Sequence, residues 1–110
     1  MDGLVILTKI EEMDAYSHHA LIQFPKYEKF VLCADIRNTI ANIVRFTIRA
    51  GKRYFKKTTL QDLDIEIEYM RAMIRKSLAL KYINLHRYKV WIEHINEIGK
   101  MLGGWLKNTK

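Results

Sequence analysis

Four long segments of the 110-residue chain repeat apolar residues every three or four positions, which is the spacing of one face of an α-helix. The repeat is most regular in the last segment, and short breaks separate each segment from the next. Because one proline and five glycines are the only strong breakers, long helices are favoured over a loop-rich fold. The pattern predicts helices over residues 4–23, 26–52, 60–82 and 85–107.

The expected core follows the main apolar line of each segment. In the first two segments these positions are Ile6, Ile10, Met13, Ser17, Ala20, Phe30, Cys33, Ile40, Val44 and Ile48. In the last two they are Leu60, Leu63, Ile67, Met70, Ile74, Leu78, Leu85, Tyr88, Ile92, Ile95, Gly99, Leu102 and Leu106. Caps are expected at Gly51, at Thr58 or Thr59, and at Asn84.

Helices of this length joined by short connections must run antiparallel to their neighbours. The chain is therefore predicted to be all-α, an up-down-up-down four-helix bundle forming a single domain over residues 1–110. Leu63, Ile65 and Ile67 alternate with acidic residues as in a strand, but the longer helical periodicity around them outweighs that signal.

Two helices carry a second apolar line beside the first. On the fourth helix it consists of Trp91, Ile98 and Trp105, and on the third it consists of Ile65, Ala72 and Leu80. One interpretation is a wide core stripe. The other is an interface with a further subunit or partner, for which Trp91, Ile98 and Trp105 are the candidates.

The residue patterns of catalytic and metal sites are missing from the sequence. No Glu is followed three positions later by His, as di-iron bundles require, and the adjacent His18 and His19 diverge on a helix. Cys33 lies in an apolar stripe, which favours a buried, inert thiol. We expect no enzyme activity, no metal and no cofactor.

The sequence also predicts a cytoplasmic location without a membrane partner. A single cysteine is typical of a reducing compartment. No secretion signal is recognisable, and no apolar run approaches the roughly 18 residues that cross a bilayer.

Positive charge is concentrated in two runs of a chain whose formal net charge is +7. Six Lys and Arg residues, and no acid, lie between residues 45 and 57, and six more lie between residues 70 and 92. Such runs either form a solvated face or neutralise phosphates of nucleic acid. Four aromatic residues interleave with them and could stack on bases or pack in the protein, namely Tyr54, Phe55, Tyr82 and Tyr88.

Several stretches resemble a known bacterial family. They are residues 24–30 (FPKYEKF), 34–37 (ADIR), 63–64 (LD), 78–81 (LALK) and above all 97–107 (EIGKMLGGWLK). The family is that of the accessory variability determinant proteins of diversity-generating retroelements. It is related to the bundle proteins encoded in intervening sequences of bacterial 23S ribosomal RNA genes.

The resemblance implies a homopentamer shaped as a short, positively charged barrel. It also implies binding to a reverse transcriptase and its RNA or RNA/DNA template, in support of mutagenic retrohoming. The family has no catalytic residues and binds through distributed basic side chains, for which the candidates are Arg37, Arg45, Arg49, Lys52, Arg53, Lys56, Arg71 and Arg75. The alternative is a structural or interaction bundle of the intervening-sequence type, without a polymerase partner.

Overall fold

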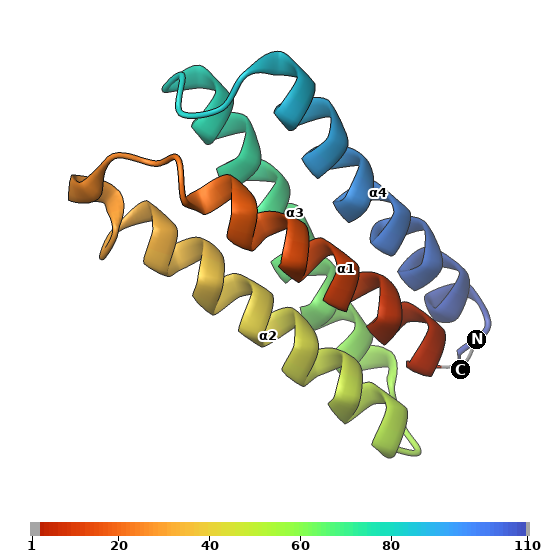
Figure 1. The fold of residues 1–110 in the computed structure, drawn as a ribbon. Coiled ribbons are helices and arrows are strands. Elements are labelled where there is room, and N and C mark those ends of the chain that lie inside the picture. The colour runs from red at the N-terminus through yellow and green to blue at the C-terminus, as the bar shows by residue number, and fades with distance from the viewer. Residues whose placement is uncertain (1–2, 110) are drawn as a thin grey trace.

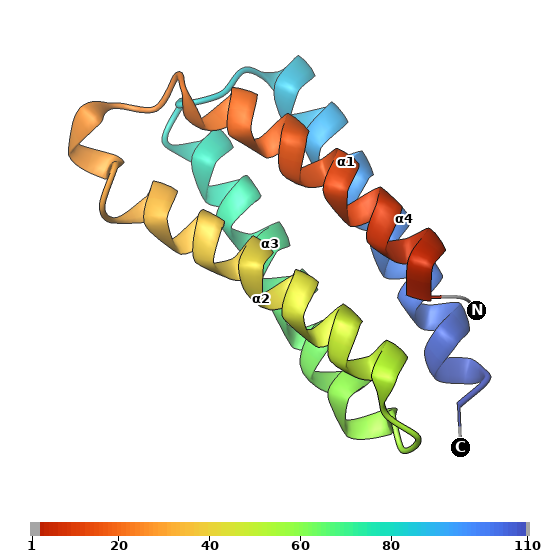
Figure 2. The same cartoon turned by 60° about the horizontal axis from the view of Figure 1, so that its bottom comes forward.

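The computed structural model describes residues 3–109, which form four α-helices and one 3-10 turn. The elements are α1 (Gly3–Leu21), η1 (Lys26–Glu28), α2 (Leu32–Lys52), α3 (Lys57–Ala79) and α4 (Leu85–Lys107). The chain reverses direction after each helix, so neighbouring helices are antiparallel (Figures 1 and 2). Because α1 also packs against α4, the four helices close into a bundle, and the predicted up-down-up-down fold is confirmed.

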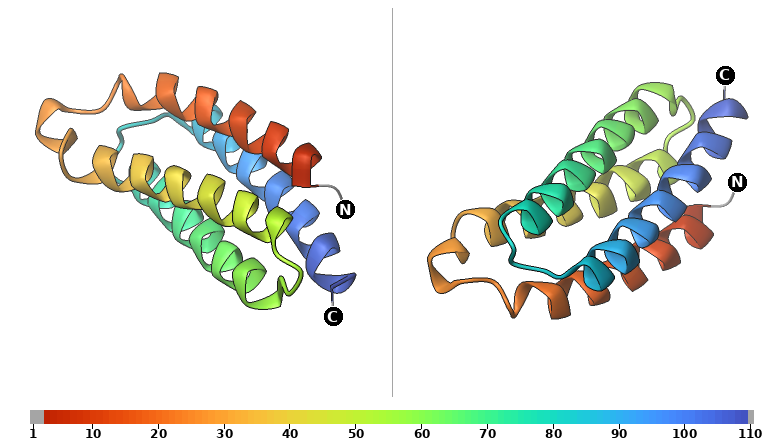
Figure 3. Two further views of the ribbon diagram at one scale, coloured as in Figure 1. Left: turned by 90° about the horizontal axis from the view of Figure 1, so that it is seen from below. Right: turned by 90° about the horizontal axis from the view of Figure 1, so that it is seen from above.

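The two ends of the bundle differ in what connects the helices. At one end lies the short α2–α3 connection, beside the start of α1 and the finish of α4 (Figure 3). At the other end lie η1 and the α3–α4 connection. The bundle measures 43 × 25 × 19 Å, so the two ends are well separated.

The core agrees with the prediction in α1 and, from Leu60 to Ile74, in α3, and it departs from the prediction in parts of the second and fourth segments. All five predicted α1 positions are buried. In the second predicted helix, Phe30 and Ile48 are exposed, whereas Cys33 and Ile40 are buried as predicted. Ile36 and Ile43, which the prediction did not include, complete the buried face of α2. Buried hydroxyls are satisfied by the carbonyl one turn earlier at 2.8 Å, which is how a helix tolerates Ser17, Thr39, Thr47 and Ser77 in its core.

The core face of α4 combines the second apolar line of the sequence with Ile95 and Leu102 of the predicted main line. Trp91 and Ile98 are completely buried and Trp105 nearly so, whereas Leu85 on the predicted main line is 56% exposed. Side chains with almost no accessible surface cannot contact another molecule in this fold. The interface interpretation of Trp91, Ile98 and Trp105 is therefore wrong, and the wide core stripe explains them.

The second helix begins six residues later than predicted because residues 26–31 are held by distant contacts. The hydroxyl of Tyr82 donates a hydrogen bond to the Glu28 carboxylate at 2.8 Å and lies 3.1 Å from the Tyr27 hydroxyl. The Tyr82 ring also packs on Phe24, with 5.2 Å between ring centroids. These contacts fix a 3-10 turn against the α3–α4 connection, so regular helix starts only at Leu32.

One of the three predicted caps is confirmed. The Asn84 side chain accepts a hydrogen bond from the backbone N–H of Arg87 at 2.8 Å, as a helix N-cap does. Gly51 is not a cap, because α2 continues to Lys52 and its C-cap residue is Arg53. Thr58 and Thr59 lie inside α3, which begins at Lys57.

The end of α3 contains a strained residue that provides a stability prediction. Lys81 has φ 64°, and the hydrogen bonds Tyr82 N–H to Ser77 C=O and Lys81 N–H to Leu78 C=O complete a Schellman motif. Glycine is the residue best suited to that left-handed position. We expect Lys81→Gly to raise the free energy of unfolding by about 1 kcal/mol, measured by urea denaturation. An unchanged or lower stability would contradict the left-handed conformation.

Candidate nucleic-acid interface

Five candidate cations lie along α2 and its C-terminus, and all five are exposed. Within residues 3–109 none of them forms an ion pair with an acidic side chain; they are Arg37, Arg45, Arg49, Lys52 and Arg53. The Arg45 guanidinium donates to the Asn42 side-chain oxygen at 3.3 Å, and that of Arg49 lies 5.5 Å from the centroid of the Phe46 ring. Neither contact neutralises charge, so these guanidinium groups remain open to an anion.

The last three of these residues, together with the exposed Lys57, form a dense group that we call the basic end of α2: Arg49, Lys52, Arg53 and Lys57. The sequence from residue 45 to residue 61 contains no acid. The C-terminal carbonyls of α2 carry only a partial negative charge. This end of the bundle therefore presents several fixed positive charges to solvent, which is the electrostatic pattern that attracts phosphate.

Lys56 has a structural role instead of a binding role. Its ammonium donates hydrogen bonds to the carbonyl oxygens of Ala50 at 2.7 Å and Arg53 at 2.6 Å. These are carbonyls that the end of α2 would otherwise leave without a partner. The ammonium therefore closes the α2–α3 connection and is engaged within the protein.

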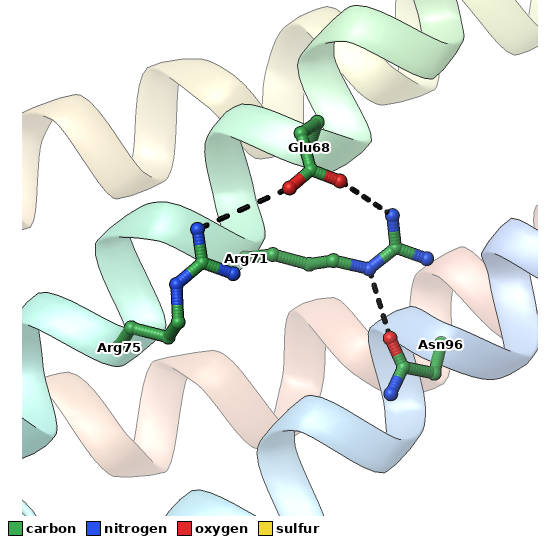
Figure 4. A network of polar contacts seen from close by, with 4 residues as sticks. All are labelled: Glu68, Arg71, Arg75 and Asn96. Atoms are coloured by element: carbon green, nitrogen blue, oxygen red, sulfur yellow. Dashed lines mark hydrogen bonds and ion pairs between the residues drawn. The ribbon is translucent and has the colours of Figure 1, made fainter.

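Arg71 and Arg75 lie on α3, in a polar network with Glu68 and Asn96 (Figure 4). Arg71 pairs with Glu68 at 3.0 Å and donates to the Asn96 side-chain oxygen on α4 at 2.8 Å. Arg75 reaches the other Glu68 oxygen at 3.9 Å. Since Glu68 offsets part of their charge, these two arginines are weaker candidates for phosphate than those on α2.

Gly99 on α4 makes room for the Arg71 side chain. A Cβ atom at Gly99 would collide with the Arg71 guanidinium. The space that Gly99 leaves is therefore occupied by a side chain of α3 and not by the backbone of a neighbouring helix. A Cβ at Gly103 or Gly104 would meet nothing within 4 Å, so packing within the described chain does not explain those two glycines.

The four interleaved aromatic residues separate into two kinds. Tyr82 and Tyr88 are half-buried and pack against the core, and hydrogen bonding with Tyr27 and Glu28 raises the pKa of Tyr82. Tyr54 and Phe55, in the α2–α3 connection, are 89% and 81% exposed. Only this second pair is free to stack on a ligand.

The structure also shows an exposed apolar face on α3 that the sequence pattern indicated only in part. Ile65 and Leu80 of the predicted second line are 63% and 44% exposed. Tyr69 lies one turn after Ile65 and is exposed as well, although sequence reasoning did not single it out. Tyr69 lies four residues after Ile65 and three before Ala72, and this helical spacing would have predicted that it belongs to the same face.

The described residues offer little support for metal or thiol chemistry. No group of three or more His, Cys, Asp or Glu side chains within residues 3–109 is placed to hold a metal ion. Cys33 is buried, and that burial raises the pKa of its thiol, which favours the unreactive protonated form. None of the helices in this part of the chain is long and apolar enough to cross a membrane.

Comparison with known protein families gives a match to the chain. A family model described as bAvd-like matches residues 4–109, which includes all four helices except the first residue of α1. No curated protein matches the chain.

Proposed function

The chain belongs to the bAvd-like family of accessory variability determinants, and on that premise we propose that it is a binding subunit of a diversity-generating retroelement. This family is accessory and non-catalytic. In the proposed role the protein binds the reverse transcriptase of the element together with its RNA and cDNA, and so supports mutagenic retrohoming. It does so in the cytoplasm, without a cofactor and without chemistry of its own.

The observation that supports nucleic-acid binding most directly is the basic end of α2. Its cations are exposed and lack acidic partners in the described chain, so they can release bound counterions when they contact phosphates. Contacts of this kind position a nucleic acid without reading its sequence.

Reconstitution with the reverse transcriptase tests this proposal. The purified protein, a reverse transcriptase of a diversity-generating retroelement and its template RNA are mixed, and the complex is isolated by size exclusion. We expect all three to elute together. If the protein bound RNA but never the polymerase, the intervening-sequence type of function would replace the retroelement role.

The further proposal that the protein is a homopentamer is supported by two complementary surfaces on the same chain. A groove of about 420 Å³ runs between α1 and α2, with Leu21, Ile40 and Val44 among its lining residues and Arg37 and Arg45 beside them. The exposed face of α3 carries Ile65, Tyr69 and Ala72 in helical register, with Asp64 at its side.

The two surfaces both combine apolar side chains with charges of both signs. Arg37, Arg45 and Asp14 line the groove, and Asp64, Glu68 and Arg75 line the α3 face. An apolar helix face can enter an apolar groove, and Asp64, which forms no ion pair within the described residues, would meet the arginines of the groove. Because the groove and the α3 face lie on different parts of each copy, the contact is head-to-tail. Head-to-tail contacts close into a ring when the rotation from one copy to the next divides a full turn, so this pairing is compatible with a pentamer.

A mixing experiment checks the head-to-tail contact. Ala41→Trp fills the groove and leaves the α3 face unchanged. Ile65→Asp places a charge on the apolar α3 face and leaves the groove unchanged. We expect the wild type at about five times the chain mass of 13.1 kDa by light scattering, and each variant alone as a monomer. A mixture of the two variants should form a dimer and stop there, since only one competent contact remains.

Two outcomes would contradict this account of assembly. A monomeric wild type excludes the pentamer. A pentameric wild type whose two variants are also pentameric, or remain monomeric when mixed, places the subunit contact elsewhere. Far-ultraviolet circular dichroism of each variant separates loss of assembly from loss of fold.

A further inference from the structure

The α2–α3 connection presents two neighbouring aromatic side chains almost entirely to solvent. Tyr54 and Phe55 are 89% and 81% exposed, and their rings meet edge to face with 4.9 Å between centroids. Exposed single apolar residues are common, but two large adjacent rings at the end of a bundle form a concentrated apolar surface. We call this pair the aromatic tip.

The backbone on both sides of the aromatic tip is held in place. Lys56 bonds back to the carbonyls of Ala50 and Arg53, and the Arg53 N–H donates to the Arg49 carbonyl at 3.0 Å. After the tip, the Leu60 N–H donates to the Lys56 carbonyl at 2.9 Å. A fixed backbone presents the rings to a ligand with less ordering on binding than a free loop would need.

A hollow of about 390 Å³ lies beside the aromatic tip. It is lined by Tyr54, Phe55 and Lys56 and, from the end of α4, by Asn108 and Thr109. Its volume is within the range of about 300–1,000 Å³ that is usual for small-ligand sites. Its lining combines two ring faces with an amide that can both donate and accept hydrogen bonds, which are the groups that recognise a planar heterocycle.

From these observations we infer that the aromatic tip is a stacking site for unpaired nucleobases, so that this end of the bundle binds single-stranded nucleic acid. The inference rests on the proposed nucleic-acid function and adds a ligand class and a site to it. Aromatic rings combined with a basic groove are the usual means of binding single strands, because every base has a face on which a ring can stack. Bases within a duplex are already stacked on one another and cannot reach Tyr54 or Phe55.

The charge around the aromatic tip favours nucleic acid over other partners. Arg53 and Lys57 flank the two rings, and no acidic residue occurs between residues 45 and 61. The opposite end of the bundle also exposes two rings, those of Tyr27 and Phe30. There, however, the Tyr27 hydroxyl is bonded to Tyr82, and Glu28 brings a negative charge into the same cluster.

The test compares single-stranded RNA with blunt RNA duplex of the same length, using the full-length protein. Tyr54→Ala combined with Phe55→Ala should weaken single-strand binding about 10- to 100-fold and change duplex binding less than about twofold. The matched control, Tyr27→Ala with Phe30→Ala, removes two equally exposed rings from the other end and should alter neither affinity. Quenching of a 2-aminopurine base in the single strand should be lost only in the Tyr54 and Phe55 variant.

Each remaining outcome overturns the inference. If the Tyr54 and Phe55 variant lost equal affinity for single strand and duplex, or lost affinity for neither, the aromatic tip would not bind unpaired bases. The proposed binding of phosphates would not be affected by that result. Loss of binding to phosphatidylserine vesicles, with single-strand affinity unchanged, assigns the aromatic tip to a lipid surface instead. Failure of the wild type to bind either RNA at low salt overturns the proposed nucleic-acid function along with the inference.

Discussion

Replacing Arg49, Lys52 and Arg53 with glutamine is expected to weaken binding to an RNA/DNA hybrid duplex about 500-fold at 0.1 M salt. Each phosphate contact in a duplex releases about 0.9 counterion, which corresponds to about 0.9 logarithmic units of affinity at that salt concentration. Three contacts therefore account for about 2.7 units. Because these side chains are exposed, the substitutions should leave the free energy of unfolding nearly unchanged.

A charge-matched control separates the basic end of α2 from net charge alone. Lys26, Lys29 and Lys89 are also exposed, and replacing them with glutamine removes the same three positive charges. Electrophoretic mobility shift or fluorescence anisotropy should show only a small loss for this control. If both triple variants lost affinity equally, the overall charge of +7 would explain binding, and no specific face would be needed.

Trp91→Ala is expected to lower the free energy of unfolding by about 3–5 kcal/mol, the usual loss when a buried aromatic side chain is truncated. The Trp91 indole is completely buried, and its N–H donates to the Ser17 hydroxyl at 2.8 Å, so it joins α4 to α1. The Ser17 hydroxyl in turn donates to the Met13 carbonyl at 2.8 Å. Chemical denaturation monitored by circular dichroism measures the loss.

Ser17→Ala serves as the companion measurement. It leaves the buried indole N–H without an acceptor and should lower the free energy of unfolding by about 1–3 kcal/mol. The double variant should lose less than the sum of the two single losses, because both remove the same hydrogen bond. If Trp91→Ala left the fold stable and only dissociated an oligomer, Trp91 would be a subunit contact after all.

The fold was predictable from sequence wherever local signals agreed with long-range packing. The bounds of α4 match the prediction at both ends, because Asn84 is a good N-cap and the apolar repeat is uninterrupted to Lys107. The start of α2 was not predictable. The turn at residues 26–28 depends on Tyr82, which lies more than 50 positions away in sequence.

The core face of α4 illustrates a second limit of sequence reasoning. The lines through Ile92 and Ile95 and through Trp91 and Ile98 lie side by side on the helix, so periodicity alone cannot say which one is central. Packing decides this, because the large Trp91 ring fits between α1 and α4 and meets Phe24 edge to face at 6.4 Å. The exposed edge of the stripe therefore falls on Leu85.

The candidate site was predictable as a region and not residue by residue. Sequence located the acid-free run from Arg45 to Lys57, and in the structure every Lys and Arg of that run except the half-buried Lys56 is exposed. It could not reveal that Lys56 is engaged with two backbone carbonyls or that Glu68 and Asn96 hold Arg71. Such pairings depend on which helices are adjacent in the bundle, and the order of charges along the sequence does not determine which helices are adjacent.

Salt titration of the wild type and the Arg49, Lys52 and Arg53 variant on the same hybrid duplex tests the central claim most directly. If the basic end of α2 binds phosphates, the logarithm of the wild-type affinity falls linearly with the logarithm of salt concentration. The slope for the variant should then be shallower by about 2–3. A wild-type affinity that does not change with salt concentration, or equal slopes for the two proteins, would contradict electrostatic binding through this surface.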